Sequence, residues 1–210
     1  MKEIIGIYLA AGKSRRMGKC KLSLPLAVKP LGTIALKEIM QSNIDHLLVV
    51  TNDIRADWLN SADVLRAYLN KWENIVCLQA HLGQSYSLRT GIRRAEQLGA
   101  KSVIVFLADQ PFVTSKMINL VINEARNDHV YVASSDGKVL KPPILFNEKA
   151  FDELMIINGD QGARSLLRKG TFSGTSIQMS PDYLFDIDTV EEYEYAKTYY
   201  LGNINHFLSL

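Results

Sequence analysis

Near the amino terminus, a stretch of small residues is followed directly by a cluster of positive charge. Residues 10–12 read Ala-Ala-Gly, so a loop built from them lets backbone N–H groups approach a ligand closely. Basic residues then follow at short intervals: Lys13, Arg15, Arg16, Lys19 and Lys21. This combination is typical of a polyphosphate-binding loop, although the glycine spacing fits neither a Walker loop nor a dinucleotide fingerprint. The alternative is a basic surface loop after a core strand.

A second candidate is Asp109, which follows the most hydrophobic segment of the chain, residues 102–107, and precedes Pro111. An acid directly after a buried strand lies at the carboxyl edge of the sheet, and the fixed φ of proline restricts the turn. Mg²⁺ takes few protein carboxylates and completes its shell with water and phosphate oxygens. Asp109 is therefore a candidate ligand for a nucleotide-bound Mg²⁺, the alternative being an ordinary turn or capping aspartate.

A second acidic segment reads Asp-Ile-Asp-Thr at residues 186–189. If this segment is part of a strand, the side chains of Asp186 and Asp188 point the same way and can share one cation. The alternatives are that Asp188 is the N-cap of the last helix, or that both acids are solvated.

The predicted elements that position these residues alternate between strand and helix through the first ~130 residues. Strands are predicted at residues 4–9, 46–51, 75–78, 102–107 and 130–133, and helices at 31–42, 57–70, 85–97 and 115–125. This order implies right-handed βαβ units, and hence a mostly parallel, doubly wound (Rossmann-like) sheet in a three-layer α/β/α fold. Ligands bind such sheets at the carboxyl ends of the strands.

The later part of the chain is less regular. We expect an extended segment at 142–146, short helices at 148–155 and 162–169, and strands at 176–179 and 183–186. Thr189 and Glu192 form a capping-box pattern that opens a last helix over residues 190–200. No repeat or linker interrupts the chain, so residues 1–210 are predicted to form a single domain.

Composition narrows the classes of function. The chain is 47% hydrophobic and 22% charged with a net charge of +2, which makes no general case for a nucleic-acid or membrane partner. The two cysteines, Cys20 and Cys77, suggest neither a disulfide framework nor a metal site. Neither a leader peptide nor a membrane-length apolar run is evident, so we expect a cytoplasmic protein.

Residues 9–26 closely resemble the opening motif of nucleotidyltransferases related to molybdenum cofactor cytidylyltransferase (MobA-like NTP transferases). Leu-Ala-Asp-Gln-Pro at residues 107–111 is similar to the metal-binding motif of that family, and residues 186–192 are similar to its closing motif. In the closing motif the aspartate before the threonine completes the metal site, which favours Asp188 over Asp186. The resemblance implies a fold of the nucleotide-diphospho-sugar transferase type and a Mg²⁺ ion held by Asp109 and Asp188.

The resemblance also implies a nucleotide site. Ser85 or Ser87 alone would be interpreted as a helix N-cap, but residues 83–88 resemble a family loop that meets the base and ribose. Relatives that use GTP tend to carry a glycine at the position of Ala11, which favours CTP. The implied nucleotide-binding residues are Leu9, Ala10, Ala11, Gly12, Ser14, Arg16, Gly18, Lys21, Gly83, Ser85, Ser87 and Asp109.

Two further segments, residues 141–146 and 159–164, resemble the acceptor side of the family's site. The implied acceptor-binding residues are Lys141, Pro142, Asp160, Gly162 and Arg164. Lys141 departs from the pattern, because a small or imidazole residue is more usual there, although a lysine can hold a phosphate.

The reaction implied is attack of an acceptor phosphate on the α-phosphorus of CTP, with release of pyrophosphate. Arg16 would hold the β- and γ-phosphates, Lys21 the α-phosphate, and Asp109 the metal, and these three form the implied catalytic set. The implied acceptor is the pterin phosphate of the molybdenum cofactor. Two alternatives stay open: transfer to a sugar phosphate or another small phosphate, or a cofactor carrier that docks on a molybdenum hydroxylase such as xanthine dehydrogenase.

Overall fold

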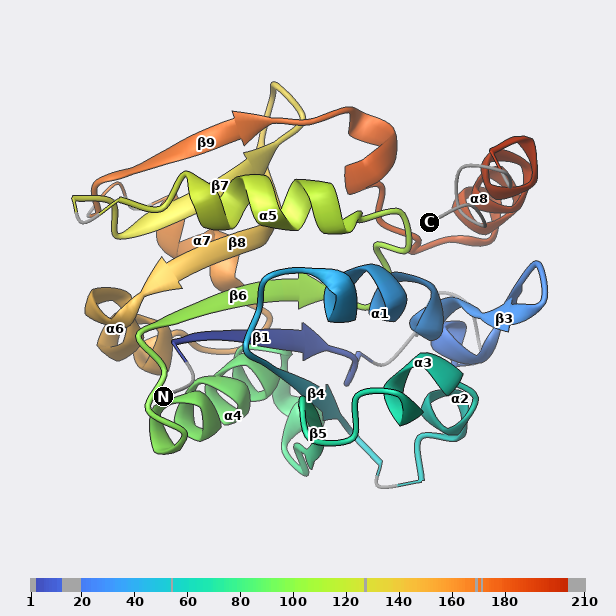
Figure 1. The fold of residues 1–210 in the computed structure, drawn as a ribbon, viewed down its shortest axis with the longest axis horizontal. Helices are drawn as coiled ribbons and strands as arrows, with labels where there is room; N and C mark the ends of the chain where they lie inside the picture. Colours follow the sequence, from blue (N-terminus) through green and yellow to red (C-terminus); the bar gives the residue numbers. More distant parts are fainter. Residues whose placement is uncertain are drawn as a thin grey trace.

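A seven-stranded sheet forms the centre of the molecule in this computed structural model, which describes residues 3–12, 20–53, 55–126, 128–168, 170 and 172–203 (Figure 1). The strand order across the sheet is β5-β4-β1-β6-β8-β7-β9. The strands are β1 (Ile4–Leu9), β4 (His46–Thr51), β5 (Trp72–Val76), β6 (Ser102–Leu107), β7 (Tyr131–Ser135), β8 (Leu140–Asn147) and β9 (Gly174–Gln178). A separate hairpin joins β2 (Pro25–Leu26) to β3 (Lys29–Pro30).

The half of the sheet that carries the candidate residues is parallel. β1 pairs in parallel with both β4 and β6, and β4 pairs in parallel with β5. β8 runs antiparallel to β6 and β7, and β9 is parallel to β7. Because β1 and β6 are parallel neighbours, their carboxyl ends meet at the same edge, and Ala108 N donates to Leu9 O at 3.2 Å. The mostly parallel sheet agrees with the sequence prediction.

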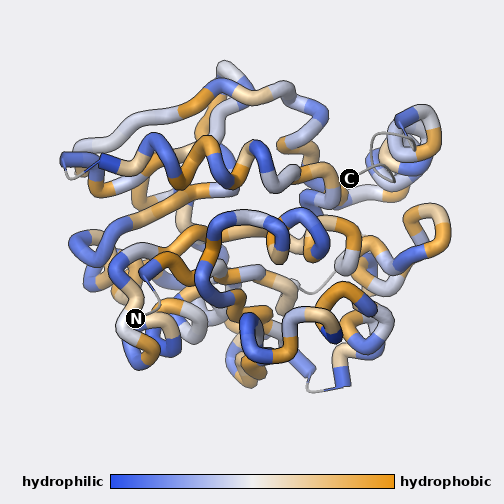
Figure 2. Tube along the Cα trace, viewed as in Figure 1, coloured by the Kyte–Doolittle hydropathy of each residue, from blue (hydrophilic) through white to orange (hydrophobic). Residues whose placement is uncertain are grey.

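Helices cover both faces of the sheet, which gives the predicted three layers (Figure 1). One face carries α1 (Leu31–Gln41) and α5 (Ser115–Asn123), whose apolar residues pack in one core cluster with Tyr8. The other carries α4 (Gln84–Gln97), α6 (Phe151–Ile156) and α7 (Ala163–Leu167), which pack with Ile7 in a second cluster. Neighbouring residues of β1 thus face opposite layers, as strand geometry requires. Along α5, each turn carries both hydrophobic and hydrophilic residues, and the buried ones are Met117, Ile118 and Val121 (Figure 2).

Two features of the middle of the chain differ from the prediction. The single helix expected at 57–70 is instead two short ones, α2 (Asp57–Asn60) and α3 (Asp63–Arg66). The residues between them, Ser61 and Ala62, donate their backbone N–H groups to Trp58 O and Leu59 O in tight turns that end α2. The third strand, β5, begins at Trp72 rather than at residue 75.

The carboxyl-terminal part contains one error and one confirmed signal. Residues 183–186 do not form a strand, because η5 (Pro181–Leu184) is a 3-10 helix with proline in its first turn, which suits the fixed φ of that residue. The capping box is present as predicted: the Thr189 side chain accepts from Glu192 N, and the Glu192 side chain accepts from Thr189 N. It opens α8 (Val190–Gly202). Within the described ranges, helices are too short or too polar to cross a bilayer.

Candidate active site

A cavity of about 440 Å³ lies at the carboxyl ends of β1 and β6. Nine of the residues predicted from the sequence line it: Leu9, Ala11, Gly12, Lys21, Gly83, Ser87, Asp109, Asp160 and Asp188. Further lining residues were not predicted: Ala80, His81, Leu82, Gln84 and Leu107. Most of these belong to η3 (Ala80–Leu82) and the start of α4, and their position after a parallel strand is the sequence signal that could have identified them.

Lys21 lies at the centre of the charged part of this cavity. It is the first residue of η2 (Lys21–Ser23), and its side chain is only 10% exposed. Its Nζ lies 2.6 Å from Asp109 Oδ2, 2.8 Å from Asp188 Oδ1 and 2.8 Å from Ile187 O. An ammonium group has three N–H donors, so these acceptors match its full capacity. Three segments that are far apart in the sequence therefore converge on one atom.

The backbone holds the two carboxylates in place. Asp109 lies two residues beyond the end of β6, and its backbone O accepts from Ile187 N at 3.0 Å. Asp188 N donates to Glu192 Oε2 at 2.7 Å, which fixes the residue against the first turn of α8. Asp188 is thus not the N-cap of α8, a position that Thr189 occupies.

The charges around Lys21 favour binding of a further cation. Burial raises the pKa of Asp109 above its usual value; Lys21 opposes this rise, and the charges of Asp186 and Asp188 add to it. Burial lowers the pKa of Lys21, but the charges and hydrogen bonds of Asp109 and Asp188 outweigh burial, so that pKa lies above its usual value. When both carboxylates are ionised, one ammonium leaves an excess negative charge that a divalent ion would neutralise.

The oxygen atoms present fit a hard divalent cation. Asp109 Oδ1 is buried and accepts no hydrogen bond from the described residues, whereas the Asp188 side chain is 47% exposed. Mg²⁺ and Mn²⁺ prefer such oxygen ligands. Among the residues that the structure describes, no group of three or more His, Cys, Asp or Glu side chains could hold a metal. Water and phosphate oxygens would have to complete the shell.

Elsewhere in the lining of the cavity, Gly83 allows two loops to touch. Its φ is +134°, and a Cβ at this position would lie 2.2 Å from the backbone C and O atoms of Gly159. Only glycine permits this approach without displacement of the backbone. Ser85 donates its backbone N–H and its hydroxyl to Gly159 O, at 3.1 and 2.8 Å. Neither Ser85 nor Ser87 is the N-cap of α4, because Gly83 has that position.

The predicted residues that do not line the cavity have other neighbours. Ala10 and Ser85 are buried behind its wall, and a Cβ on Gly162 would lie 2.3 Å from Gln84 Oε1. Lys141, Pro142 and Arg164 lie in β8 and α7, also outside the lining. Predicted residues Ser14, Arg16 and Gly18 lie outside the described part of the chain.

The strand that would point Asp186 and Asp188 the same way is not formed at these residues. Because residues 186–188 are not in a strand, their side chains do not follow the two-residue alternation. Asp186 Oδ1 accepts from Gln110 Nε2 at 2.8 Å, while Asp188 contacts Lys21. The two acids therefore bind different partners.

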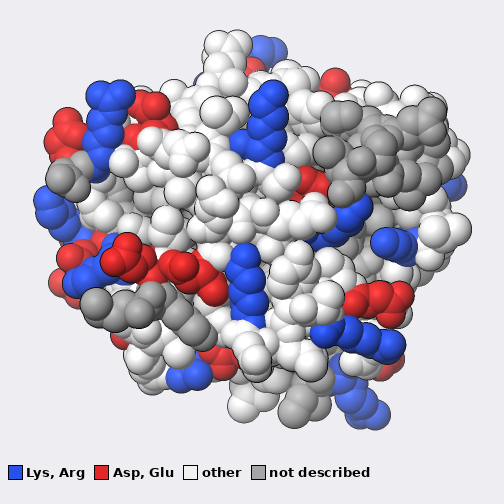
Figure 3. All heavy atoms as spheres, viewed as in Figure 1, with Lys and Arg blue, Asp and Glu red and all other residues white. Residues whose placement is uncertain are grey.

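On the face shown in Figure 3, which carries α1 and α5, acidic and basic side chains are interspersed. A single-sign field that could attract a polyanion does not extend over this face.

A mostly parallel sheet with a lysine and two carboxylates at its carboxyl edge fits a nucleotidyltransferase, and the sequence comparison shows that class. The sequence pattern described as the MobA-like NTP transferase domain matches residues 6–175, and the chain belongs to that family. It is 36% identical over 198 residues to the purine catabolism protein PucB of Bacillus subtilis, covering 92% of this chain and 96% of PucB.

Two other proteins extend the comparison. A probable molybdenum cofactor guanylyltransferase of Natranaerobius thermophilus is 29% identical over 126 residues, which cover 60% of this chain and 56% of that protein. The crystal structure of the Rv0371c homolog from Mycobacterium sp. strain JC1 superimposes with a TM-score of 0.80 at 23% identity, covering 95% of this chain and 97% of the other. The structural match supports the fold.

Proposed function

We propose that this nucleotidyltransferase transfers CMP from CTP to the phosphate of molybdopterin, with Mg²⁺ as cofactor and pyrophosphate as the second product. The observation that carries the proposal is the convergence of Asp109 and Asp188 on Lys21 in a cavity at the carboxyl ends of β1 and β6. Family membership supports nucleotidyl transfer; the nucleotide, the metal and the acceptor are the finer parts of the proposal.

Each charged group has a task in this reaction. Lys21, which bonds Asp109 in this structure, would contact the α-phosphate when the nucleotide is bound, and a fixed cation there would stabilise the charge that builds up in the transition state. Asp109 and Asp188 would hold Mg²⁺, which would neutralise phosphate charge. Arg16 would hold the β- and γ-phosphates, as the family resemblance implies. A general base is not required, because the attacking phosphate is already ionised.

The choice of CTP rests on Ala11. This residue lines the cavity and is only 3% exposed, so its methyl group takes room that a glycine would leave. A pyrimidine needs less room than a purine, which is consistent with an alanine here and a glycine in relatives that use GTP. One relative is named a guanylyltransferase, so both nucleotides must be compared directly.

The choice of acceptor rests on Asp160 and on the relative PucB. Asp160 lines the same cavity as Lys21 and can contact an incoming acceptor. PucB is named for purine catabolism, which fits a role related to xanthine dehydrogenase. We propose that the product is delivered to an enzyme of the xanthine dehydrogenase type, in the cytoplasm.

The test is pyrophosphate release from each of the four NTPs, with and without molybdopterin and with and without Mg²⁺. We expect release with CTP only when both acceptor and metal are present. Release that needs a sugar phosphate instead of molybdopterin would replace the proposed acceptor. Tight binding of molybdopterin with no release from any NTP would favour a carrier.

A further inference from the structure

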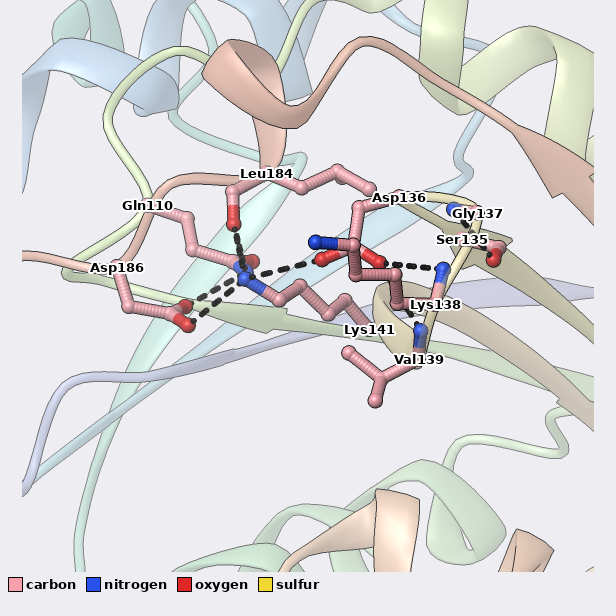
Figure 4. A network of polar contacts seen from close by, with 9 residues as sticks. All are labelled: Gln110, Ser135, Asp136, Gly137, Lys138, Val139, Lys141, Leu184 and Asp186. Carbon is pink, nitrogen blue, oxygen red and sulfur yellow. Dashed lines mark hydrogen bonds and ion pairs between the residues drawn. The ribbon is translucent and has the colours of Figure 1, made fainter.

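Lys141 belongs to a polar network just outside the cavity (Figure 4). It lies near the start of β8, and its Nζ faces three acceptors: Leu184 O at 3.1 Å, Asp186 Oδ2 at 3.5 Å and Asp136 Oδ2 at 3.7 Å. These acceptors come from the turn between β7 and β8 and from the segment that leads to Asp188. The N–H groups of Lys141 are therefore directed at the protein itself.

The Asp136 end of this network is firmly anchored. Asp136 Oδ1 accepts the backbone N–H groups of Lys138 and Val139, each at 2.9 Å, in the tight turn before β8. These two hydrogen bonds, and then the charge of Lys141, hold the pKa of the Asp136 carboxyl below its usual value. Asp136 thus stays ionised, and its second oxygen remains directed at Lys141.

The network also includes residues close in sequence to the two proposed metal ligands: Gln110 follows Asp109, and Asp186 lies near Asp188. Gln110, fully buried beside Asp109, donates from Nε2 to Asp186 Oδ1 at 2.8 Å and to Leu184 O at 3.4 Å. Asp186 in turn lies two residues before Asp188. The contacts of Asp186 therefore bear on the position of Asp188.

The segment between η5 and α8 needs such support, because residues 185–189 have no regular secondary structure. Its position also places Asp186 close enough to Asp109 to raise the pKa of that carboxyl by charge repulsion. The side chains of Lys141, Asp136 and Asp186 are 19%, 16% and 34% exposed, so their ion pairs are screened less than surface pairs.

We propose that Lys141 is a positioning residue: it braces residues 184–188 against the β7–β8 turn and so fixes Asp188 at the metal site. The proposal deepens the proposed function and rests on it for the role of the metal. It competes with the sequence-based expectation that Lys141 binds the acceptor. If Lys141 positions Asp188, its substitution should lower metal affinity. If Lys141 binds the acceptor, its substitution should lower acceptor affinity instead.

The first experiment follows amide hydrogen exchange in the whole chain. Ile187 N and Asp188 N donate to Asp109 O and Glu192 Oε2, so their exchange reports on the braced segment. We expect Lys141→Met to make these amides exchange about 10-fold faster, as expected for loss of hydrogen bonds to a charged group. Lys141→Arg should restore slow exchange, and Lys101→Met, at an exposed ion pair with Glu148, should change nothing there. Unchanged exchange in Lys141→Met overturns the proposal.

The second experiment titrates the same variants with Mn²⁺ alone and follows free Mn²⁺ by electron paramagnetic resonance. Loss of an outer-shell contact should weaken binding by about 10-fold in Lys141→Met. Asp186→Asn alone should also weaken Mn²⁺ binding. In the double variant with Lys141→Met, the loss of Mn²⁺ affinity should be smaller than the sum of the two separate losses, because both substitutions break the same contact. If Lys141→Met does not fold, Asp136→Asn removes the anchor instead and should weaken binding less.

Other outcomes are equally informative. A raised acceptor KM in Lys141→Met, with exchange and Mn²⁺ binding unchanged, would make Lys141 an acceptor ligand and overturn the brace. If amides exchange faster in Lys141→Met but the parent protein does not bind Mn²⁺, the positioning role of Lys141 would stand and the metal assignment of the proposed function would be wrong.

Discussion

The two walls of the cavity are built in different ways. On the carboxylate side, defined here as Lys21, Asp109 and Asp188, distant segments meet through short contacts between full charges, 2.6 and 2.8 Å long. On the loop side, defined as Gly83 and the turn at Gly159, the segments meet through backbone atoms and the hydroxyl of Ser85. Substitutions on the first side change charge, whereas substitutions on the second change shape.

This difference leads to different expectations for mutants. Charge placed where a phosphate reacts acts on the transition state, so its loss should reduce turnover strongly while the fold persists. Backbone contact between two loops acts on the geometry of the binding site, so its loss should reduce stability and binding more than the chemical step. The following predictions test this contrast, from the largest expected effect to the smallest.

Asp109→Asn should have the largest effect. The substitution removes the buried carboxylate that is proposed to hold the metal, and loss of that charge stabilisation should lower Mg²⁺-dependent pyrophosphate release by about 10³-fold or more. Asp152→Asn, at an exposed position in α6, is the matched control and should behave like the parent. Pyrophosphate release that persists in Asp109→Asn would mean that the metal is held elsewhere.

Lys21→Ala should come next, with a loss of turnover of about 10²-fold or more, since removal of one stabilising donor at a reacting oxyanion costs that much. Circular dichroism should show a folded protein, and Lys29→Ala, an exposed lysine in β3, should keep parental turnover. Equal turnover in Lys21→Ala and the parent would contradict the expectation that charge on the carboxylate side acts on the chemical step.

The sequence predicts best those parts of the fold and the site that depend on residues close together in the chain. β1, β4 and β6 could be placed to the residue because each contains an apolar run that is buried on both faces. The capping box at Thr189 and Glu192 was equally clear, since it depends on two residues three positions apart.

Long-range contacts could not be predicted from periodicity. The partners of Lys141 lie at Asp136, Leu184 and Asp186, and no pattern in the sequence links these positions. The strand expected at 183–186 failed because Tyr-Leu-Phe looks extended, whereas Pro181 starts a 3-10 helix. That Lys21 and Asp109 lie at one edge of the sheet could be anticipated from the predicted parallel strands, whereas Asp188 could be assigned to the same site only from the family resemblance.

Gly83→Ala tests the loop side. A Cβ would lie 2.2 Å from the Gly159 backbone at a φ of +134°, so the two loops must separate, and we expect a loss of about 2 kcal/mol of stability. The acceptor KM should rise more than turnover falls, because Asp160 follows Gly159 directly. Gly99→Ala is the matched control: φ is +80° there, but nothing lies within 4 Å of the new Cβ. Equal thermal unfolding in the two variants would show that the contact between the loops contributes nothing.

Ala11→Gly should have the smallest effect, and a selective one. Removal of one buried methyl group opens the wall near the proposed base site, and a single methyl group in a pocket discriminates by about 10-fold. The ratio of kcat/KM for CTP to that for GTP should therefore fall by about 10-fold, while Mn²⁺ affinity stays at the parental value. Ala80, which also lines the cavity, provides the matched control Ala80→Gly. A drop in the use of both nucleotides by the same factor would mean that Ala11 shapes the phosphate loop rather than the base site, and the carboxylate side would then extend further round the cavity than proposed.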